Sequence, residues 1–374
     1  MILITGGAGF IGSNFVLHLL NERVVSERIV VLDNLTYAGN MNNLSSVQEN
    51  PNFEFIKCDI NNSIELKKNI KNLSPRAIVH FAAESHVDRS ILGPSKFIET
   101  NINGTFNLLE SSYEYFLTLN DNASEKIDNI SKKQFRFLHV STDEVYGTLS
   151  PEEPSFSESH PYKPNSPYAA SKASSDFLVR AWNKTYNLPT LITNCSNNYG
   201  PYQFPEKLIP LVISNALDEK PIPIYGNGMQ IRDWLYVSDH CRAISLILEK
   251  GVTGETYNIG GNFESTNIKL VERICTILDD LAPIKASKRI NRYHELIKFV
   301  DDRPGHDKRY AINNKKIRDT LGWEPKETLF SGLKKTVQWY IDNSEWIKSI
   351  KNNSYQDLTE KYYSAESRKC KNET

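Results

Sequence analysis

Short apolar runs alternate with longer amphipathic runs along the first half of the chain, which is the pattern of βα units around a parallel sheet. Apolar runs of this length predict strands, and the amphipathic runs between them predict helices. The predicted strands are Ile2–Thr5, Ile29–Asp33, Phe53–Lys57, Ala77–Phe81, Phe135–Ser141 and Thr190–Thr193. The predicted helices include Ser13–Asn21, Ser95–Asn120 and Pro167–Tyr186, with a polar surface loop over Asp121–Lys133.

The rhythm changes after about Asn194, where short elements are separated by proline and glycine. This pattern predicts a smaller domain that folds over the carboxyl edge of the sheet, where open α/β sheets bind ligands. The sheet domain is predicted over residues 1–194 and the smaller domain over 195–360, with a frayed tail over 364–374. Parts of 233–262 still show a strand and a helix pattern, so the two domains are expected to interleave.

Charge and cysteine content exclude several classes of protein. Lysine and arginine number 44 and aspartate and glutamate 45, a net charge of -1 that predicts no binding to nucleic acid or to a membrane surface. No apolar stretch approaches the length that spans a membrane, and no signal peptide is expected. The 5 cysteines are scattered and include no Cys-x-x-Cys pair, which argues against a zinc site and favours a reducing compartment. The sequence therefore predicts a cytoplasmic protein without a bound metal.

The segment from Ile2 to Gly12 combines a buried strand, a glycine turn and the start of a helix. Gly6, Gly9 and Gly12 allow the backbone to turn tightly and to approach a pyrophosphate at the helix N-terminus. A tight turn without a ligand is the alternative, but strand and helix stand where dinucleotide binding requires them. We therefore expect an α/β fold of the Rossmann type, a doubly wound parallel sheet that binds a dinucleotide.

Asp33 distinguishes between the two nicotinamide dinucleotides, since it stands at the end of the second predicted strand. A carboxylate there accepts hydrogen bonds from the ribose hydroxyls and repels a 2′-phosphate, which favours NAD over NADP. The alternative is that Asp33 and Asn34 only cap the next turn, which leaves the spacing from the glycines unexplained. Asp59, after the third predicted strand, is either a contact for the adenine amino group or a carboxylate of a surface turn.

Tyr168 and Lys172 lie four residues apart and therefore share one face of a predicted helix. An ammonium beside a phenol favours the phenolate, so the pKa of Tyr168 is expected to fall from about 10 towards neutrality. Such a tyrosine can remove the proton of an alcohol while NAD takes the hydride. A Tyr-x-x-x-Lys pair is common by chance on exposed helices, but this one follows a nucleotide turn and the run Ser141–Glu144 at a strand end.

Asp143 and Glu144 add an acid and a base side by side, which simple hydride transfer does not need. The alternative is that both carboxylates only cap the following turn. Adjacent acids at the carboxyl end of a parallel strand, within reach of the Tyr-Lys helix, favour chemistry instead. They predict a chain that oxidises its substrate, eliminates water from it and reduces it again.

Taken together, these motifs resemble the extended short-chain dehydrogenase/reductase family, and longer runs resemble the dTDP-glucose 4,6-dehydratases within it. Related epimerases carry small or hydroxyl residues at the positions of Asp143 and Glu144, and GDP-mannose dehydratases and UDP-glucuronate decarboxylases usually carry serine at the first. The resemblance covers nearly the whole chain. The runs that carry it are His80–Ser90, Ser141–Gly147, Asn194–Pro201 and Asp302–His306.

The resemblance implies a lyase that converts dTDP-glucose to dTDP-4-keto-6-deoxyglucose and water, with NAD held tightly and regenerated in each cycle. Tyr168, assisted by Thr142 and Lys172, is expected to remove the 4-hydroxyl proton as the C4 hydride passes to NAD. Glu144 is then expected to remove the C5 proton and Asp143 to protonate the departing C6 hydroxyl, before the hydride returns to C6.

The resemblance also implies the binding residues. Lysine and arginine side chains among them suit a diphosphate, although isolated cations more often form surface ion pairs. The expected contacts with NAD are Gly6, Gly9, Phe10, Ile11, Gly12, Asp33, Asn34, Leu35, Thr36, Asp59, Ile60, Phe81, Ala82, Ala83, Ser85, Thr100, Tyr168, Lys172 and Asn197. The expected contacts with the substrate are Ser85, Thr142, Asn197, Lys207, Leu208, Pro223, Tyr225, Arg232, Asn267, Arg303, His306 and Tyr355.

Three further expectations concern assembly and the competing functions. The run Ser95–Asn120 carries more apolar residues than one contact with a sheet requires, so a homodimer is expected through this helix and Pro167–Tyr186. Another nucleotide-sugar dehydratase or a 4-epimerase is the alternative enzyme, and Asp143 argues against it. A binding protein of the same fold without catalysis is the non-enzymatic alternative, and the retained Tyr168 and Lys172 argue against that.

Overall fold

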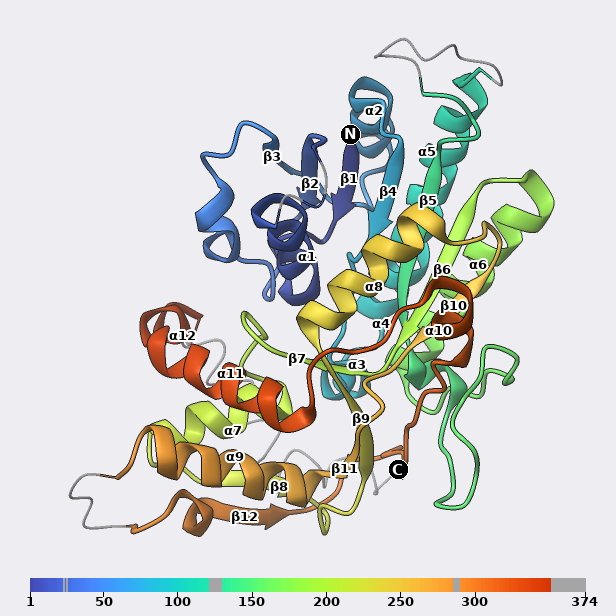
Figure 1. The fold of residues 1–374 in the computed structure, drawn as a ribbon. Helices are drawn as coiled ribbons and strands as arrows, with labels where there is room; N and C mark the ends of the chain where they lie inside the picture. The colour runs from blue at the N-terminus through green and yellow to red at the C-terminus, as the bar shows by residue number, and fades with distance from the viewer. Residues whose placement is uncertain (23, 25, 121–129, 285–289, 351–374) are drawn as a thin grey trace.

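The structure is a computed structural model, which describes residues 1–350 apart from 23, 25, 121–129 and 285–289. Figure 1 shows two lobes, with the larger lobe built on the first half of the chain. The expected substrate contact Tyr355 and the expected frayed tail lie outside the described residues, as does most of the expected polar loop.

The larger lobe contains a sheet of 7 strands in the order β10-β6-β5-β4-β1-β2-β3, and every neighbouring pair is parallel. β1 lies inside the sheet between β4 and β2. The strand order runs outward in opposite directions from this point, so the sheet is doubly wound as predicted. The strands are β1 (Ile2–Thr5), β2 (Ile29–Asp33), β3 (Phe53–Lys57), β4 (Ala77–His80), β5 (Arg136–Thr142), β6 (Thr190–Cys195) and β10 (Thr256–Ile259).

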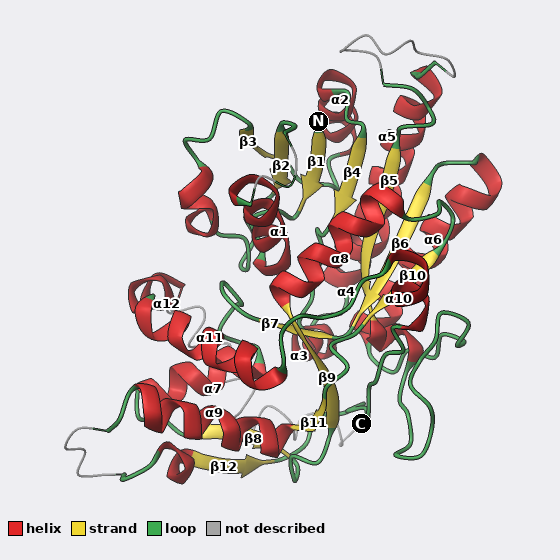
Figure 2. Ribbon diagram, viewed as in Figure 1, coloured by secondary structure: helices red, strands yellow, loops and turns green. Residues whose placement is uncertain are grey.

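Successive side chains of these strands point to opposite faces of the sheet, where two separate apolar cores form. Ile2 and Ile4 belong to the core that includes Phe15, whereas Leu3 belongs to the core that includes Leu108. Figure 2 shows helices in front of and behind the strands. The first core lies under α1 (Phe10–Asn21), α8 (Val237–Lys250) and α10 (Lys315–Leu321), and the second under α2 (Ser63–Leu73), α5 (Thr105–Thr118) and α6 (Pro167–Tyr186).

The helix predicted over Ser95–Asn120 is interrupted. It consists of α4 (Ser95–Phe97), a π-helical segment (Ile98–Gly104) and α5. Within that segment, the Asn101 side chain accepts a hydrogen bond from the Glu84 backbone N–H at 2.8 Å and donates to the Glu84 carbonyl at 3.0 Å. This non-local contact, which the hydrophobic pattern does not reveal, locates a widened helical turn beside the loop that follows β4.

The smaller lobe gathers short strands and helices around a third core that includes Tyr199, Ile213 and Leu333. Its strands are β7 (Asn197–Tyr199), β9 (Ile231–Tyr236) and β11 (Glu264–Thr266) in one sheet, and β8 (Ile222–Tyr225) and β12 (Ile297–Val300) in another. Its helices are α7 (Leu208–Leu217), α9 (Asn267–Leu281), α11 (Leu329–Asp342) and α12 (Ser344–Ile350). The remaining short helices are α3 (Val87–Leu92) and the 3-10 turns Met41–Val47, Asp143–Tyr146 and Tyr293–Leu296.

The two lobes share the chain rather than divide it at one point. After β9 in the smaller lobe, the chain returns as α8, which packs on α1, and then as β10, which pairs with β6. In Figure 1 the strand arrows of the larger sheet point towards the smaller lobe, so the two lobes meet at the carboxyl edge of the sheet. The exact domain boundaries stay a prediction.

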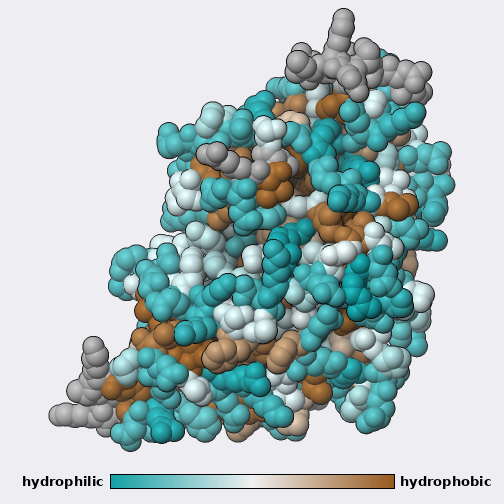
Figure 3. Space-filling view, viewed as in Figure 1, coloured by the Kyte–Doolittle hydropathy of each residue, from teal (hydrophilic) through white to brown (hydrophobic). Residues whose placement is uncertain are grey.

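The face of the molecule in Figure 3 is mostly hydrophilic, with separate hydrophobic patches on both lobes. Among the described residues, no helix is long and apolar enough to cross a membrane.

The packing of α2 generates a test of the second core. Ile70 is 0% exposed beneath the helix, whereas Ile64 on the same helix is 83% exposed. We expect Ile70→Ala to lower the free energy of unfolding by about 2–5 kcal/mol, and the matched control Ile64→Ala to change it by less than about 0.5 kcal/mol. Urea unfolding followed by circular dichroism measures both. Equal midpoints for the two variants would contradict the packing described here.

Candidate active site

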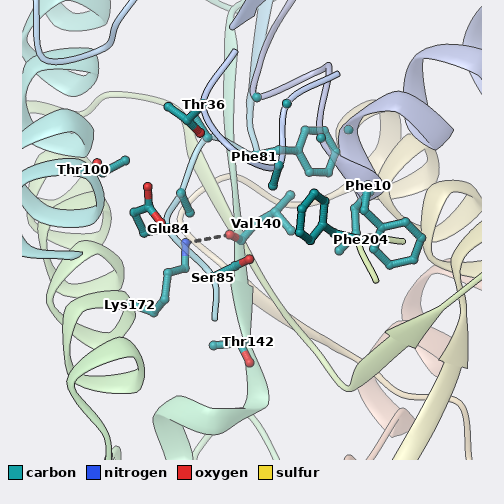
Figure 4. Close-up of a pocket in the computed structure, with 18 of the residues that line it drawn as sticks. Phe10, Thr36, Phe81, Glu84, Ser85, Thr100, Val140, Thr142, Lys172 and Phe204 are labelled. Atoms are coloured by element: carbon teal, nitrogen blue, oxygen red, sulfur yellow. Dashed lines mark hydrogen bonds between the residues drawn. The ribbon is translucent and has the colours of Figure 1, made fainter. Parts of the chain in front are cut away.

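A cleft with a volume of about 480 Å³ opens at the carboxyl ends of β1, β2, β4, β5 and β6. Its wall on the side of the smaller lobe includes Phe204 and Lys207. In Figure 4, Thr100, Glu84 and Lys172 enter it from one side and Phe10 and Phe204 from the other. Both lobes therefore contribute to one site, at the edge of the sheet that the sequence predicted.

The glycine turn forms one end of this cleft and leaves no room for side chains at two positions. Gly6 has a φ of +72°, and a Cβ there would lie 2.5 Å from the backbone nitrogen of Ala82. A Cβ on Gly12 would lie 2.2 Å from the Gly6 carbonyl oxygen. The backbone thus passes directly from β1 into the N-terminus of α1, where the N–H groups of the first turn have no partner within the helix, as a pyrophosphate site requires. These residues fit a dinucleotide.

Asp33 supports the glycine turn as well as lining the cleft. One carboxylate oxygen accepts a hydrogen bond from the Ala8 backbone N–H at 2.9 Å, and the other from the Leu35 backbone N–H at 2.8 Å. Burial raises the pKa of this carboxyl above its ordinary value, and the two hydrogen bonds partly offset that rise. Asp33 therefore does cap the neighbouring turns, as the alternative interpretation expected. The contact of Asp33 with a ribose stays a prediction.

Most of the expected cofactor contacts line the same cleft. Asp59 accepts a hydrogen bond from the Asn34 side chain at 2.8 Å, which joins the ends of β2 and β3. Leu35, by contrast, is not part of the lining. The expected contacts that do line it are Gly6, Gly9, Phe10, Ile11, Gly12, Asp33, Asn34, Thr36, Asp59, Ile60, Phe81, Ala82, Ala83, Ser85, Thr100, Tyr168, Lys172 and Asn197.

Asp143 and Glu144 follow β5 directly, and a hydroxyl caps the turn that holds them. Thr142 Oγ1 accepts a hydrogen bond from the Glu144 backbone N–H at 3.2 Å and donates to Asp143 Oδ1 at 3.4 Å. Asp143 is 1% exposed, and its second oxygen has no partner among the described residues. The Thr142 hydroxyl caps this turn, so neither carboxylate is needed for that purpose. The alternative that Asp143 and Glu144 only cap the turn therefore has no support in these contacts.

Burial separates the two carboxyl groups chemically. The pKa of Asp143 rises well above its ordinary value because the group is buried, and the charge of Glu144 raises it further. Burial also leaves the pKa of Glu144 above its ordinary value, although the positive charges of Arg303, Lys207 and Arg232 offset part of that rise. At neutral pH this arrangement favours a protonated Asp143 beside an ionised Glu144, which is how a site maintains an acid next to a base.

Tyr168 and Lys172 enter the cleft from α6. This helix begins where the Ser166 hydroxyl accepts a hydrogen bond from the Ala169 backbone N–H at 3.1 Å, with Pro167 in the first turn. The Tyr168 ring makes an edge contact with the Phe97 ring, with centroids 6.3 Å apart. Lys172 Nζ donates a hydrogen bond to the Val140 carbonyl at 2.9 Å, as Figure 4 shows.

The expected fall in the pKa of Tyr168 is not what the structure shows. Burial raises the pKa of the phenol well above its ordinary value, and the negative charge of Glu144 raises it further, whereas the Thr142 side chain lowers it. The sequence reveals the nearby ammonium but not the loss of solvent around the phenol. In the protein alone, the loss of solvent is the larger effect.

Basic side chains of the smaller lobe face the carboxylates. Lys207 Nζ donates to the Ser85 carbonyl at 2.7 Å, and Arg232 donates to the Asp307 carbonyl at 3.0 Å. Arg303 Nε lies 3.8 Å from Asp88, whereas its buried Nη1 has no partner among the described residues. A buried guanidinium nitrogen without a partner fits an anionic ligand such as a diphosphate.

The remaining expected substrate contacts fall into three groups. Tyr225 donates to Asp88 at 2.9 Å, and its ring lies 6.1 Å from that of His306, so both adjoin Arg303. Of the expected substrate contacts that the structure describes, only Ser85, Thr142, Asn197 and Lys207 line the cleft itself. The expected contacts outside its lining are Leu208, Pro223, Tyr225, Arg232, Asn267, Arg303 and His306. Tyr355 lies outside the described residues.

Glu206 lines the cleft but was not predicted, and two residues outside the lining contact its side chain. Arg89 donates to Glu206 at 2.8 Å and stacks on the ring of Tyr37, with 3.6 Å between its Cζ and the ring centroid. Tyr37 also forms a hydrogen bond with Glu206, so the loop after β2 is joined to the segment before α7. Arg89 lies within the run His80–Ser90, which was the only available signal. His80 itself is structural, since its ring contacts two threonine hydroxyls at 2.7 and 3.0 Å.

This fold and cleft define a dinucleotide-binding enzyme of the Rossmann type. A family model described as GDP-mannose 4,6 dehydratase matches residues 3–336, and the chain therefore belongs to that family. Within it, the chain is 55% identical over 354 residues to the dTDP-glucose 4,6-dehydratase of Neisseria meningitidis serogroup B, covering 95% of this chain and 97% of the relative.

Solved structures agree with this placement. The dTDP-glucose 4,6-dehydratase DesIV of Streptomyces venezuelae, with NAD and TYD bound, matches with a TM-score of 0.82 and 44% identity, covering 94% of this chain and 99% of the other. The dTDP-glucose 4,6-dehydratase of Bacillus anthracis, in complex with NAD, matches with a TM-score of 0.79 and 46% identity, again over 94% of this chain and 99% of the other. The family that the sequence motifs predicted is thus confirmed.

The glycine turn generates a test of cofactor binding. We expect the protein to be purified with roughly one NAD per chain, the stoichiometry of a single dinucleotide site. Gly12→Ala should abolish this occupancy, because the new methyl group would lie 2.2 Å from the Gly6 carbonyl oxygen. Acid extraction and chromatography measure the nucleotide. The control Gly93→Ala should retain it, since the nearest atom to a Cβ there is 4.0 Å away.

Recovery of NADP instead of NAD would contradict the prediction for Asp33. An unchanged NAD content in Gly12→Ala would contradict the site itself.

Proposed function

We propose that the chain converts dTDP-glucose to dTDP-4-keto-6-deoxyglucose and water, as an NAD-dependent 4,6-dehydratase. The observation that carries the proposal is the pair Asp143 and Glu144 at the end of β5, in the cleft that Tyr168 also lines, with Asp143 only 1% exposed. The reaction needs one group to remove a proton at C5 and another to protonate the departing C6 hydroxyl. The two carboxyl groups differ in protonation in the sense that these roles require.

Tyr168 is the proposed base for the 4-hydroxyl proton, with Thr142 and Lys172 as its partners. Bound NAD supplies the hydride acceptor for C4 and the hydride donor for C6. The Thr142 side chain favours the phenolate form of Tyr168, since it lowers the pKa of the phenol. Lys172 shares a face of α6 with Tyr168 and is buried, so its charge acts through a medium that screens it weakly.

Asp143 is the proposed acid and Glu144 the proposed base of the elimination. Asp143 is expected to carry a proton at neutral pH, because burial and the charge of Glu144 raise its pKa. It can therefore donate that proton to a leaving hydroxyl. Glu144 lies among the charges of Lys207, Arg232 and Arg303, which favour its ionised form and make it available to accept the C5 proton.

The same three cations are the proposed partners of the substrate diphosphate. Burial lowers the pKa of Lys207, and Glu206 and Glu144 offset this effect. An anionic ligand would restore the balance of charge around Arg303, whose Nη1 is buried without a partner in the described part of the chain. The contacts of Leu208, Pro223, Asn267 and Tyr355 with the substrate also remain proposals.

A 4-epimerase or a different nucleotide-sugar dehydratase is the competing enzyme. An epimerase transfers a hydride without eliminating water, so a buried, protonated Asp143 would have no task there. A binding protein without catalysis is the non-enzymatic alternative, and it gives no reason to place two carboxyl groups, one of them buried, in the cleft that Tyr168 lines. Product analysis separates the three: incubation with dTDP-glucose should yield a product lighter by one water that develops a ketone absorbance in alkali.

A homodimer and a cytoplasmic location are the proposed setting. The π-helical segment, α5 and α6 present large apolar side chains to solvent, with Ile98 46%, Phe106 43%, Phe177 58% and Tyr186 42% exposed. A second copy of this chain would cover this face. The cysteines within the described residues are all free, as a reducing compartment requires.

The proposed dimer is tested by its mass. Light scattering at micromolar concentration should give twice the chain mass of 42.7 kDa. Phe177→Glu should produce a monomer, because it buries a charge in the proposed contact. Phe330→Glu is the matched control, since Phe330 is 59% exposed on α11, and it should remain a dimer. A monomeric parent, or a dimeric Phe177→Glu variant, would contradict the contact.

The two halves of the proposed chemistry can be separated by substitution. Tyr168→Phe should lower the rate of C4 oxidation by about 10²–10⁴-fold, because the base is lost. Asp143→Asn retains Tyr168 and Lys172, so oxidation should persist while elimination slows. Reduced cofactor should then accumulate on the enzyme and be visible as NADH absorbance. Glu144→Gln should suppress exchange of the C5 proton with solvent deuterium.

These groups act on one substrate, so their losses will not add. An Asp143→Asn enzyme that dehydrates dTDP-glucose at the parent rate would exclude the assignment of Asp143 as the acid.

A further inference from the structure

Lys172 is buried, and two groups of β5 hold its ammonium. Its side chain is 4% exposed, and Nζ donates to the Val140 carbonyl at 2.9 Å and lies 3.2 Å from Nε2 of His139. Burial lowers the pKa of Lys172 to about 8. That value already includes the effect of a neighbouring anion, without which the ammonium would lose its proton at a still lower pH.

Asp176 is that anion. It follows Lys172 by one helical turn on α6, is 2% exposed, and places Oδ1 3.3 Å from Nε2 of His139. Among the charges around Lys172, Asp176 is the largest one that raises its pKa. Tyr168, Lys172 and Asp176 are thus spaced by four residues on one face of α6, and the His139 ring adjoins the last two from β5.

The carboxylate of Asp176 is fixed from three directions. Its Oδ2 accepts hydrogen bonds from Ser141 Oγ at 2.9 Å, from the Tyr162 hydroxyl at 2.9 Å and from Asn194 Nδ2 at 3.1 Å. Burial raises the pKa of Asp176 to about 6, so the group remains mostly ionised at neutral pH. Asp176 is not part of the cleft lining.

The other titratable groups around this array are neutral at working pH. Burial lowers the pKa of His139 well below its ordinary value, and the same holds for His80 of β4, whose ring centroid lies 5.1 Å from that of His139. Burial raises the pKa of the Cys195 thiol on β6 far above its ordinary value. The array therefore contains one cation and one anion, with a neutral imidazole beside both.

We propose that Asp176 is a positioning residue that acts through Lys172: its carboxylate lies one turn further along α6, across the His139 ring, and its charge keeps the Lys172 ammonium protonated behind Tyr168 during the reaction. This inference rests on the proposed roles of Tyr168 and Lys172. It extends the pair that drives oxidation to a buried array that includes one group from β5.

Asp176→Asn tests the proposal, because asparagine keeps the shape and an oxygen for the three donors but removes the charge. Lys172 should then lose its proton at lower pH, so the alkaline limb of the kcat profile should move down by about one pH unit or more, the effect of removing an opposite charge at ~4–6 Å. The KM for dTDP-glucose should stay unchanged, since Asp176 does not line the cleft. NAD content and circular dichroism verify that the variant is folded.

Tyr162→Phe is the matched control. It removes one of the three hydrogen bonds to Asp176 Oδ2 and leaves the charge, so the alkaline limb should keep the parent position even if the protein unfolds more easily. If Asp176 served only to join α6 with β5 and β6, both Asp176→Asn and Tyr162→Phe would lower the unfolding midpoint. The alkaline limb of the kcat profile would then stay at the parent position in both variants.

His139→Gln provides a second variant in case Asp176→Asn does not fold. It breaks the contact of the ring with both partners, and its alkaline limb should move in the same direction. The proposal is overturned if a folded, NAD-containing variant of Asp176 or His139 keeps the parent limb, or if Tyr162→Phe shifts it equally. Failure of the proposed function would appear in the parent enzyme as absence of the dehydrated product, so the two failures are distinguishable.

Discussion

The end of β5 at Thr142 is the constraint on which the site depends. Thr142 pairs with Cys195 on β6, and His139 of β5 pairs with His80 on β4, so the three strands end at one edge. The loop after β4, the turn after β5 and the start of β7 therefore meet there. A shift of β5 by one residue would turn Ser141 and Thr142 to the opposite faces and remove the acids from the cleft.

Because this edge is covered by the smaller lobe, the charges that it brings together are taken out of water, and each must be compensated where it lies. The carboxyl of Asp143 is compensated by a proton, and Glu144 by the cations Arg232 and Arg303. The positive charge of Lys172 is balanced by the negative charge of Asp176, which lies on the other side of the His139 ring. The protonation state of each group is thus set by its neighbours, and a single substitution changes more than the group that it removes.

The sequence predicted what depends on local pattern. The predicted limits of β1, β2 and β3 agree with the structure, and α6 begins and ends where the proline and the amphipathic pattern place it. The π-helical interruption depends on Asn101 reaching the Glu84 backbone, and the array behind Lys172 depends on a histidine from another element. Such contacts join residues distant in the chain, so periodicity does not contain them. Resemblance supplied most of the residues of the cleft. It also included Leu35 and most of the expected substrate contacts from the smaller lobe, which lie outside the lining.

The raised pKa of Tyr168 is the point at which burial and catalysis oppose each other. A phenol that ionised readily without substrate would place a second anion beside Glu144 in a buried site, which is costly. A phenol that never ionised could not accept the proton of an alcohol. NAD bound in the cleft that Tyr168 lines would supply positive charge that favours the phenolate. Burial of Tyr168 therefore sets a pKa that positive charge in the cleft must lower before this residue can act as the proposed base.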